Sequence, residues 1–360
     1  MDERIPVAVL GATGTVGQRF VSLLAEHPWF EIVSVTGSER SAGQAYGQAV
    51  KWLLPTEIPS VVREMVIGTT DSAGSNVRLV FSALPSRVAE TAEPRLASDG
   101  HLVCSNASAH RMGADIPLII PEINHHHLSL IDRQRDLRGW QGLIVTSPNC
   151  AASGIVFPLK ALYDAFGVAE VHVVTMQAVS GAGHPGVASL EIFDNIIPHI
   201  GGEQEKVEQE TRKLLGVLAG DTIAPAEIAV SAQINRVPVL DGHFAALSVR
   251  LEREASLEQV EATINEFRPR SPVDELPSAP EIPLRLRDEK DRPQPRLDRN
   301  AQGGMAITVG RLQPCSVLDY KMVSLVHNTM RGAAGGALLN AELLVAKGYL
   351  GHAKFEDAIA

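Results

Sequence analysis

One cysteine of this chain stands where a helix is expected to begin. Cys150 follows the turn Ser147-Pro148-Asn149 and precedes a run of small residues at 151–154, a pattern typical of a strand-to-helix transition. Backbone N–H groups at a helix N-terminus stabilise a thiolate, which is the nucleophilic form of cysteine. Cys150 is therefore a candidate nucleophile, and the local sequence alone does not separate this reading from a buried, inert cysteine.

The other two cysteines lie in less reactive settings. Cys104 comes at the end of a predicted strand, and Cys315 follows a proline. The three thiols are far apart and form no C-x-x-C pair, which disfavours a structural zinc site and a disulfide framework and favours a reducing, intracellular setting. Neighbouring side chains in the run His125-His126-His127 point in different directions, so we expect no metal site there.

Three glycines near the start of the chain have the spacing of a dinucleotide-binding turn. Gly11, Gly14 and Gly17 lie between an apolar run at 5–10 and a helical pattern that reaches residue 24. In such a turn the backbone N–H groups and the helix N-terminus approach a pyrophosphate. A purely structural turn is the alternative. The cofactor-binding residues expected here are Gly11, Thr13, Gly14, Thr15 and Val16.

The segment after the second predicted strand bears on the choice between NAD and NADP. An acidic residue there usually accepts the ribose hydroxyls of NAD, whereas an arginine can pair with the 2′-phosphate of NADP. This chain offers Ser38, Glu39, Arg40 and Ser41 in succession. We expect Ser38, Arg40 and Ser41 to bind NADP(H), while an inward Glu39 carboxylate would favour NAD.

The apolar runs predict an α/β chain in two parts. Four short runs separated by helical segments are typical of buried strands in a parallel sheet. They lie at 5–10, 32–35, 79–83 and 102–105. From residue 171 onward, alternating segments predict a mixed or antiparallel sheet. We therefore predict a cofactor-binding domain at 1–148 and a second domain at 149–324.

The last third of the chain holds a proline-rich segment followed by a helical one. Seven of the 22 prolines lie from Pro269 to Pro295, which predicts a long loop or arm without regular structure. Leucines set among alanines after residue 336 predict an amphipathic helix, within about 325–360, that packs back on the first domain.

The composition bounds the class of protein. A chain of 360 residues with 45% hydrophobic and 21% charged residues is typical of a soluble, globular protein of about two domains. Its 32 Lys and Arg against 42 Asp and Glu give a net charge of −10, which argues against nucleic-acid or anionic-lipid partners. The sequence shows neither a spanning apolar run nor a secretory signal, so we expect a cytoplasmic protein.

Nine ordered motifs resemble those of one enzyme family. They are GATGTVG at 11–17, SERSAG at 38–43, SNASAHRM at 105–112, SPNCAASG at 147–154, MQAVSGAG at 176–183, GGEQEKVEQET at 201–211, NRVPVLDGH at 235–243, DRPQPRLDR at 291–299 and VHNTMRGAAGG at 326–336. On these motifs the chain resembles, nearly end to end, the aspartate-semialdehyde dehydrogenases of the archaeal and fungal branch. The resemblance implies a Rossmann-like parallel-sheet domain, an α+β catalytic and dimerisation domain with a mixed sheet, and a homodimer or homotetramer.

The resemblance also implies a reaction and its two catalytic residues. The reaction is the reversible, NADPH-dependent reductive dephosphorylation of L-aspartyl 4-phosphate to L-aspartate 4-semialdehyde, in the biosynthesis of lysine, threonine, methionine, isoleucine and diaminopimelate. A thiolate that attacks an acyl phosphate releases phosphate and leaves a thioester, which accepts a hydride readily. Cys150 matches the family's nucleophile, and His243 matches its acid/base histidine, which would activate the thiol.

The same resemblance assigns the anion-binding and cofactor contacts. Arg236 matches the family's carboxylate clamp, for which a guanidinium fork is suited. Arg111 and Lys206 match the residues that hold the leaving phosphate, and Glu203 matches the residue that faces the substrate amine. Without the resemblance, the charged run 203–210 would be read as a solvated helix face. The remaining matches are Gln177 at the substrate, and Ser180, Gly181 and Asn328 at the nicotinamide side of the cofactor.

Two kinds of alternative stay open at this point. Malonyl-CoA reductase and N-acetylglutamyl-phosphate reductase also combine a Cys/His pair with NADPH. Asn149 and the pair Glu203 and Lys206 favour the aspartyl enzyme over the first, and the second resembles this chain less in its cofactor loop and in the segment before His243. A non-catalytic NADP-binding sensor would need the glycine turn but would have no use for the combination of Cys150 and His243.

Overall fold

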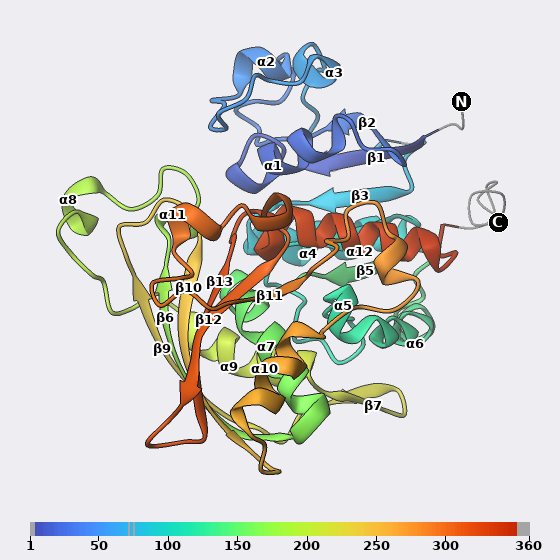
Figure 1. Cartoon of the computed structure of the whole chain (residues 1–360). Helices are drawn as coiled ribbons and strands as arrows, with labels where there is room; N and C mark the ends of the chain where they lie inside the picture. The colour runs from blue at the N-terminus through green and yellow to red at the C-terminus, as the bar shows by residue number, and fades with distance from the viewer. Residues whose placement is uncertain (1–3, 71–72, 75, 351–360) are drawn as a thin grey trace.

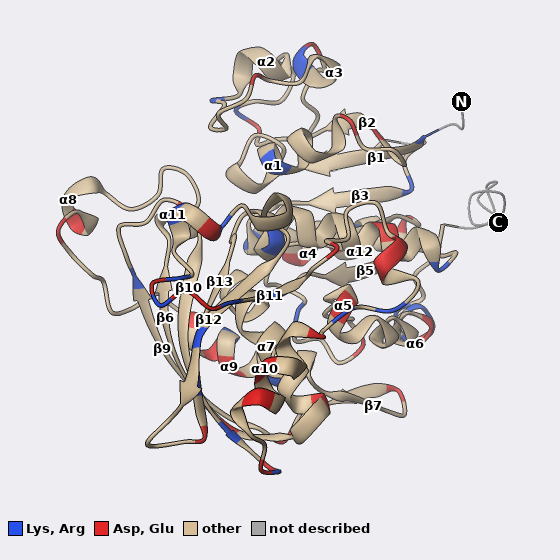
Figure 2. Ribbon diagram, viewed as in Figure 1, with Lys and Arg blue, Asp and Glu red and all other residues tan. Residues whose placement is uncertain are grey.

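The computed structural model describes residues 4–70, 73–74 and 76–350, and its centre consists of two β-sheets with their helices (Figure 1). Acidic and basic residues are interspersed over both sheets and their helices (Figure 2). Among the described helices, none combines the length and the apolar content needed to cross a lipid bilayer.

The first sheet is parallel throughout, with the strand order β2-β1-β3-β4-β5. Its strands are β1 (Ile5–Leu10), β2 (Phe30–Val35), β3 (Leu79–Ser82), β4 (Leu102–Ser105) and β5 (Leu143–Thr146). Because β3, β4 and β5 are buried at every residue, their sequences are short apolar runs without alternation. The helices of this part are α1 (Thr15–Leu24), α2 (Tyr46–Ala49), α3 (Ser60–Arg63), α4 (Ser86–Ser98), α5 (Pro121–Asn124) and α6 (Leu130–Arg138).

The strand order of this sheet reverses beside β1. Val7 of β1 lies opposite Ile32 of β2 on one side and opposite Leu79 of β3 on the other. In open α/β sheets, ligands bind outside the carboxyl ends of the strands at such a switch point. The glycine turn that follows β1 is therefore at the place where a cofactor is expected.

A helix from the far end of the chain packs on the first sheet. The leucines of α12 (Gly335–Ala346) share one apolar cluster with β1, β3 and β4, and α12 is the long red helix of Figure 1. The sequence predicted an amphipathic helix, but α12 is buried on nearly every side, because α1, α5 and the loop around Val273 and Leu276 pack against it as well as the sheet.

The predicted limits of this helix also differ from the structure. Residues 325–334 contain the end of a strand and a π-helical turn (Met330–Ala334), so the α-helix begins only at Gly335. The stretch 351–360, which the prediction included, lies outside the described residues.

The second sheet is mixed, with the strand order β11-β12-β13-β10-β6-β9. Its strands are β6 (Val168–Gln177), β9 (Ala229–Arg236), β10 (His243–Leu251), β11 (Leu284–Arg287), β12 (Ile307–Pro314) and β13 (Tyr320–Val326). One face packs against α7 (Cys150–Phe166), α9 (Glu203–Leu214) and α10 (Leu257–Asn265). On the other face, side chains such as Val174 and Phe244 are only half-buried. Smaller elements are α8 (Ser189–Ile192), α11 (Pro295–Asp298) and the strand pair β7 (Val217–Ala219) and β8 (Thr222–Ala224).

The proline-rich segment contains one strand, so the prediction of no regular structure was wrong there. β11 pairs in parallel with β12 at the edge of the second sheet. Its four residues begin directly after Pro283 and end well before Pro293, so no proline interrupts the hydrogen-bonded ladder.

Candidate active site

The candidate nucleophile and the candidate acid/base histidine lie in contact. Cys150 is the first residue of α7, His243 is the first residue of β10, and their Sγ and Nε2 atoms are 3.1 Å apart. The Asn149 side chain accepts the N–H groups of Ala151 (2.9 Å) and Ala152 (3.2 Å), and this N-cap is why α7 begins at the cysteine. A thiol and an imidazole at this distance can exchange a proton or share a hydrogen bond.

The hydrogen bonds of His243 fix which ring nitrogen carries its proton. Nδ1 accepts the backbone N–H of Ala178 (3.0 Å), so in the neutral ring the proton is on Nε2 and faces Cys150. Burial, with smaller contributions from Arg236 and His327, lowers the pKa of His243 to about 3, so the ring is neutral at pH 7. His243 is therefore placed to donate its Nε2–H to a thiolate or to an oxyanion.

The cysteine is a thiol in this state. Burial, followed by the nearby Glu203 carboxylate, raises the pKa of Cys150 to about 12, although Arg111, Arg236 and the Ala151 N–H act in the opposite direction. A bound cation that pairs with Glu203 would remove part of this destabilisation of the thiolate.

Two glycines allow loops to press against the reactive pair. A Cβ atom on Gly181 would lie 2.9 Å from Arg236 Nη1 and 3.0 Å from His243 Cε1. A Cβ atom on Gly332, in the π-helical turn, would lie 2.7 Å from the Cβ of Cys150. Because real Cβ contacts are longer than these, only glycine fits at either position without displacing the pair.

Two predicted substrate residues end neighbouring strands beside the pair. Gln177 ends β6, Arg236 ends β9, and they are opposite each other in the parallel register. Arg236 Nη1 donates to the carbonyl of Ala178 (2.7 Å), and Gln177 Nε2 lies 3.4 Å from Glu203 Oε2. Both side chains are buried. The second sheet thus places an amide and a guanidinium at the same strand ends as His243.

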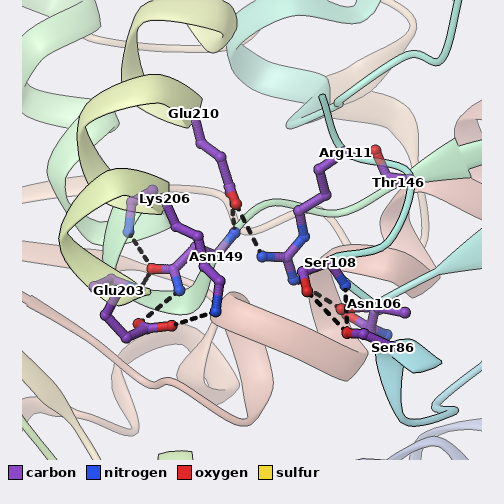
Figure 3. Close-up of polar contacts among 12 residues, drawn as sticks. Ser86, Asn106, Ser108, Arg111, Thr146, Asn149, Glu203, Lys206 and Glu210 are labelled. Carbon is purple, nitrogen blue, oxygen red and sulfur yellow. Dashed lines mark hydrogen bonds and ion pairs between the residues drawn. The ribbon is translucent and has the colours of Figure 1, made fainter. Parts of the chain in front are cut away.

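The N-terminal turn of α9 supplies the next contacts. Glu203 Oε2 accepts the Asn149 Nδ2 (2.8 Å), and Glu203 Oε1 accepts the Lys206 Nζ (3.1 Å) (Figure 3). Asn149 thus caps the cysteine helix with its oxygen and orients Glu203 with its nitrogen. The structure brings Glu203 and Lys206 together as an ion pair on the first turn of α9.

Arg111 approaches the same helix from the segment between β4 and α5. Its Nη1 donates to Glu210 Oε1 (3.0 Å), and its Nη2 donates to the carbonyl of Asn106 (2.7 Å) (Figure 3). The third nitrogen, Nε, is buried and has no hydrogen-bond partner within the described part of the chain. The guanidinium is thus held firmly and retains an unused donor.

The sequence analysis missed Glu210. This carboxylate is 1% exposed and accepts both Arg111 Nη1 and the backbone N–H of Asn149 (2.5 Å). The spacing carried a usable signal, because Glu203, Lys206 and Glu210 are separated by three and four residues and so share one face of a helix.

The glycine turn after β1 has the geometry of a cofactor-binding turn. Gly11 has a φ of +69°, which favours glycine, and a Cβ atom on Gly17 would lie 2.1 Å from the carbonyl oxygen of Gly11. The N-cap Gly14 is exposed and offers no side-chain acceptor to the first turn of α1, and the Thr15 hydroxyl is buried without a hydrogen-bond partner in the described residues. Unused donors at a helix N-terminus fit the phosphates of a dinucleotide.

The other predicted cofactor residues lie in three places. Asn328 Nδ2 donates to the Ser180 hydroxyl (2.8 Å), and Asn328 Oδ1 accepts the Gly242 N–H, so this group lies next to His243. Ser38 and Arg40 are exposed beyond the end of β2, where the Ser41 hydroxyl donates to the Ser38 carbonyl. Thr13 and Val16 are half-buried in the glycine turn. The histidines at 125–127 are not part of the site, and His127 uses both ring nitrogens in contacts with Asn124 and Gly216.

Comparison with known proteins places both halves of the chain in one family. A model described as "Semialdehyde dehydrogenase, NAD binding domain" matches residues 6–131, and one described as "Semialdehyde dehydrogenase, dimerisation domain" matches residues 159–331. Among proteins similar in sequence is the aspartate-semialdehyde dehydrogenase of Archaeoglobus fulgidus, 49% identical over 95% of this chain and 98% of the relative. That of Cryptococcus neoformans is 45% identical over 96% of this chain and 98% of the relative.

A similar solved structure is that of aspartate-semialdehyde dehydrogenase with NADP from Candida albicans. It has a TM-score of 0.88 and 38% sequence identity, and the likeness covers 96% of this chain and 99% of that one. The parallel first sheet, the mixed second sheet and the archaeal and fungal resemblance predicted from the sequence are confirmed. On this evidence the chain belongs to the aspartate-semialdehyde dehydrogenases.

Proposed function

We propose that this chain uses NADPH to convert L-aspartyl 4-phosphate into L-aspartate 4-semialdehyde and inorganic phosphate, reversibly, in the biosynthesis of the aspartate-family amino acids. One observation supports the mechanism above all: Sγ of Cys150, at the start of a helix, lies 3.1 Å from Nε2 of His243. The relatives are named for this activity, and they do not favour the malonyl-CoA or sensor alternatives.

The chemistry begins when the Cys150 thiol gives up its proton to solvent, because Nε2 of His243 already carries one, and the resulting thiolate is the nucleophile. It attacks the acyl carbon, the acyl C–O bond to phosphate breaks, and phosphate leaves with the bonding electron pair, so a thioester remains. When bound, NADPH supplies the hydride that reduces the thioester carbonyl. The oxyanion so formed receives a hydrogen bond from Nε2–H of His243, and its collapse releases the aldehyde and regenerates the thiolate. In this scheme His243 acts as a donor, because Ala178 occupies its Nδ1.

Binding of the substrate would rearrange the charges around Glu203. In our proposal Glu203 faces the substrate ammonium, so its carboxylate, which disfavours the Cys150 thiolate, stays paired with a cation. Lys206 would turn from Glu203 toward the phosphate at the same time, since the ammonium replaces it as the partner of Glu203. Arg236 would clamp the substrate carboxylate, and Arg111 would share the phosphate with Lys206. Gln177, which lies between Glu203 and Arg236 in this arrangement, would contact the substrate.

The cofactor would lie across the carboxyl ends of the first sheet. Its pyrophosphate would bind the turn of Gly11, Thr13, Gly14, Thr15 and Val16, and its 2′-phosphate would bind Ser38, Arg40 and Ser41. The nicotinamide side would contact Ser180, Gly181 and Asn328, next to the reactive pair.

The wider organisation is also part of this proposal. We infer domains at 1–148 and 149–324, with α12 completing the first. The half-buried outer face of the second sheet and the match to a dimerisation domain support a homodimer or homotetramer, which light scattering on the purified protein would distinguish. A cytoplasmic location fits a nucleophile that must stay reduced, and all three cysteines are free.

The test follows NADP reduction by the purified protein with L-aspartate 4-semialdehyde, with and without inorganic phosphate. Turnover that requires phosphate is expected, because phosphate must attack the thioester to release the product. Cys150→Ala should abolish turnover and leave NADP binding, followed by nucleotide fluorescence, unchanged. Turnover by the alanine variant at the wild-type rate would refute the nucleophile assignment.

A further inference from the structure

One carboxylate of α9 is buried at the junction of three segments. Glu210 is 1% exposed, and each of its oxygens has one partner, Arg111 Nη1 at 3.0 Å and the backbone N–H of Asn149 at 2.5 Å (Figure 3). Arg111 comes from the segment between β4 and α5, while Asn149 directly precedes the nucleophile. A single side chain thus connects a cation to the turn that positions Cys150.

A second residue of α9 holds the same segment. Lys213, one helical turn after Glu210, is buried, and its Nζ donates to the carbonyls of Arg111 (2.7 Å), Gly113 (2.8 Å) and Ile116 (2.9 Å). Glu210 therefore fixes the side chain of Arg111 while Lys213 fixes its backbone. The position of the guanidinium relative to α7 is determined by α9.

The pairing also sets what Arg111 can offer to a ligand. A buried carboxylate is costly unless it is paired and hydrogen-bonded, and both oxygens of Glu210 are. Arg111 uses Nη1 on Glu210 and Nη2 on the carbonyl of Asn106, which leaves its buried Nε without a partner among the described residues. With two of its three nitrogens held, the guanidinium has one orientation, and it loses little further freedom when an anion binds.

We propose that Glu210 is a positioning residue of the phosphate subsite, whose carboxylate holds Arg111 against the turn that carries Cys150, so that its loss weakens the use of phosphate and spares the use of the semialdehyde. This inference rests on the proposed role of Arg111 in binding phosphate. Glu210 touches neither the substrate nor the cysteine thiol in this proposal, and acts through Arg111 and Asn149.

The experiment compares four variants of the whole enzyme in the phosphorylating direction: Glu210→Gln, Glu210→Asp, Glu208→Gln and Arg111→Lys. Glu210→Gln keeps the size of the side chain, but its amide can accept from only one of the two donors. Glu208→Gln is the matched control, because Glu208 lies on the same helix and accepts the backbone N–H of Ala232 (3.0 Å), at the edge of the second sheet. Arg111→Lys tests the phosphate site itself. For each variant, KM for phosphate and KM for the semialdehyde are measured, each with the other substrates saturating.

For Glu210→Gln we expect KM for phosphate to rise at least about tenfold, the effect of losing one charge-assisted hydrogen bond, while KM for the semialdehyde stays within about twofold. Glu210→Asp keeps the charge but is one methylene shorter, so it should recover part of the loss. Glu208→Gln should match the wild type. Protection of Cys150 from iodoacetamide by inorganic phosphate gives the same comparison without turnover, so a slow variant can still be measured.

Three outcomes would overturn the proposal. If Glu210→Gln raises both KM values equally, or lowers only the melting temperature, Glu210 is merely structural. If Arg111→Lys leaves both phosphate readouts unchanged, the assignment of Arg111 has failed, and the role of Glu210 fails with it. A phosphate effect in Arg111→Lys without one in Glu210→Gln refutes the Glu210 inference alone.

Discussion

Replacing Asn149 by aspartate would change one contact in the site and keep another. Its Oδ1 caps α7, and an aspartate oxygen can accept the same two N–H groups. Its Nδ2 donates to Glu203 Oε2 at 2.8 Å, and in Asn149→Asp a second carboxylate oxygen would face Glu203 instead. The substitution therefore turns an attraction into a repulsion while the helix that carries Cys150 keeps its cap.

The size of the repulsion follows from the distance. After relaxation to a separation of about 4 Å, two like charges at an effective dielectric constant of about 20 repel by about 4 kcal/mol. The new negative charge is stabilised by the helix N-terminus, which offsets at most about 1 kcal/mol of this repulsion. The remaining cost is relieved when the two carboxylates share one proton, so the defect should shrink as the pH falls.

The control for this variant is Asn149→Ser, which keeps a capping oxygen and removes the donor without adding charge. In steady-state assays at pH 8, we expect KM for the semialdehyde in Asn149→Asp to exceed that in Asn149→Ser by at least about tenfold, since 1.4 kcal/mol corresponds to a factor of ten. The ratio should fall toward one by pH 6. Equal kinetics for the two variants at both pH values would refute the contact between Asn149 and Glu203 as a determinant of substrate binding.

Two more expectations concern the reactive pair and the buried imidazoles. In Gly181→Ala the new Cβ would meet Arg236 at 2.9 Å and His243 at 3.0 Å, so kcat/KM should fall by about 100-fold while the melting temperature changes little; a wild-type rate would contradict the packing. In urea titrations, the free energy of unfolding should fall as the pH drops from 7.5 to 5, because three histidines bind protons in the unfolded chain but stay neutral in the folded one. Each histidine contributes up to about 1.4 kcal/mol per pH unit. A free energy of unfolding that does not change with pH would contradict this. The groups are His127, His243 and His327, whose pKa values burial lowers to about 4, 3 and 4.

The sequence carried those parts of the fold and site that local patterns determine. The strands around the glycine turn and the helix start at Cys150 were predicted from short segments, because apolar runs, glycines and an N-cap asparagine act within a few residues. The pairing of Cys150 with His243 needed the family resemblance, since 93 residues separate them and no local pattern joins them.

The features that the sequence analysis did not predict depend on contacts between distant segments. Glu210 looked like part of a solvated helix face, and only the approach of Arg111, 99 residues earlier, makes it a buried acceptor. The proton on Nε2 of His243 is likewise set by the backbone of Ala178. The helix after Gly335 was expected to leave one side in water, but α1, α5 and the proline-rich segment also pack against it.

The packing of α12 has a consequence for how the protein is made. Leu338 and Leu343 of α12 lie in the same apolar cluster as Val7 of β1 and Phe81 of β3, so these strands cannot complete their core until a helix much later in the sequence has been synthesised. Until then the nascent first sheet has exposed apolar surface, and chains in this state aggregate or bind chaperones. The order of synthesis therefore delays completion of the first sheet's core until α12 has been made.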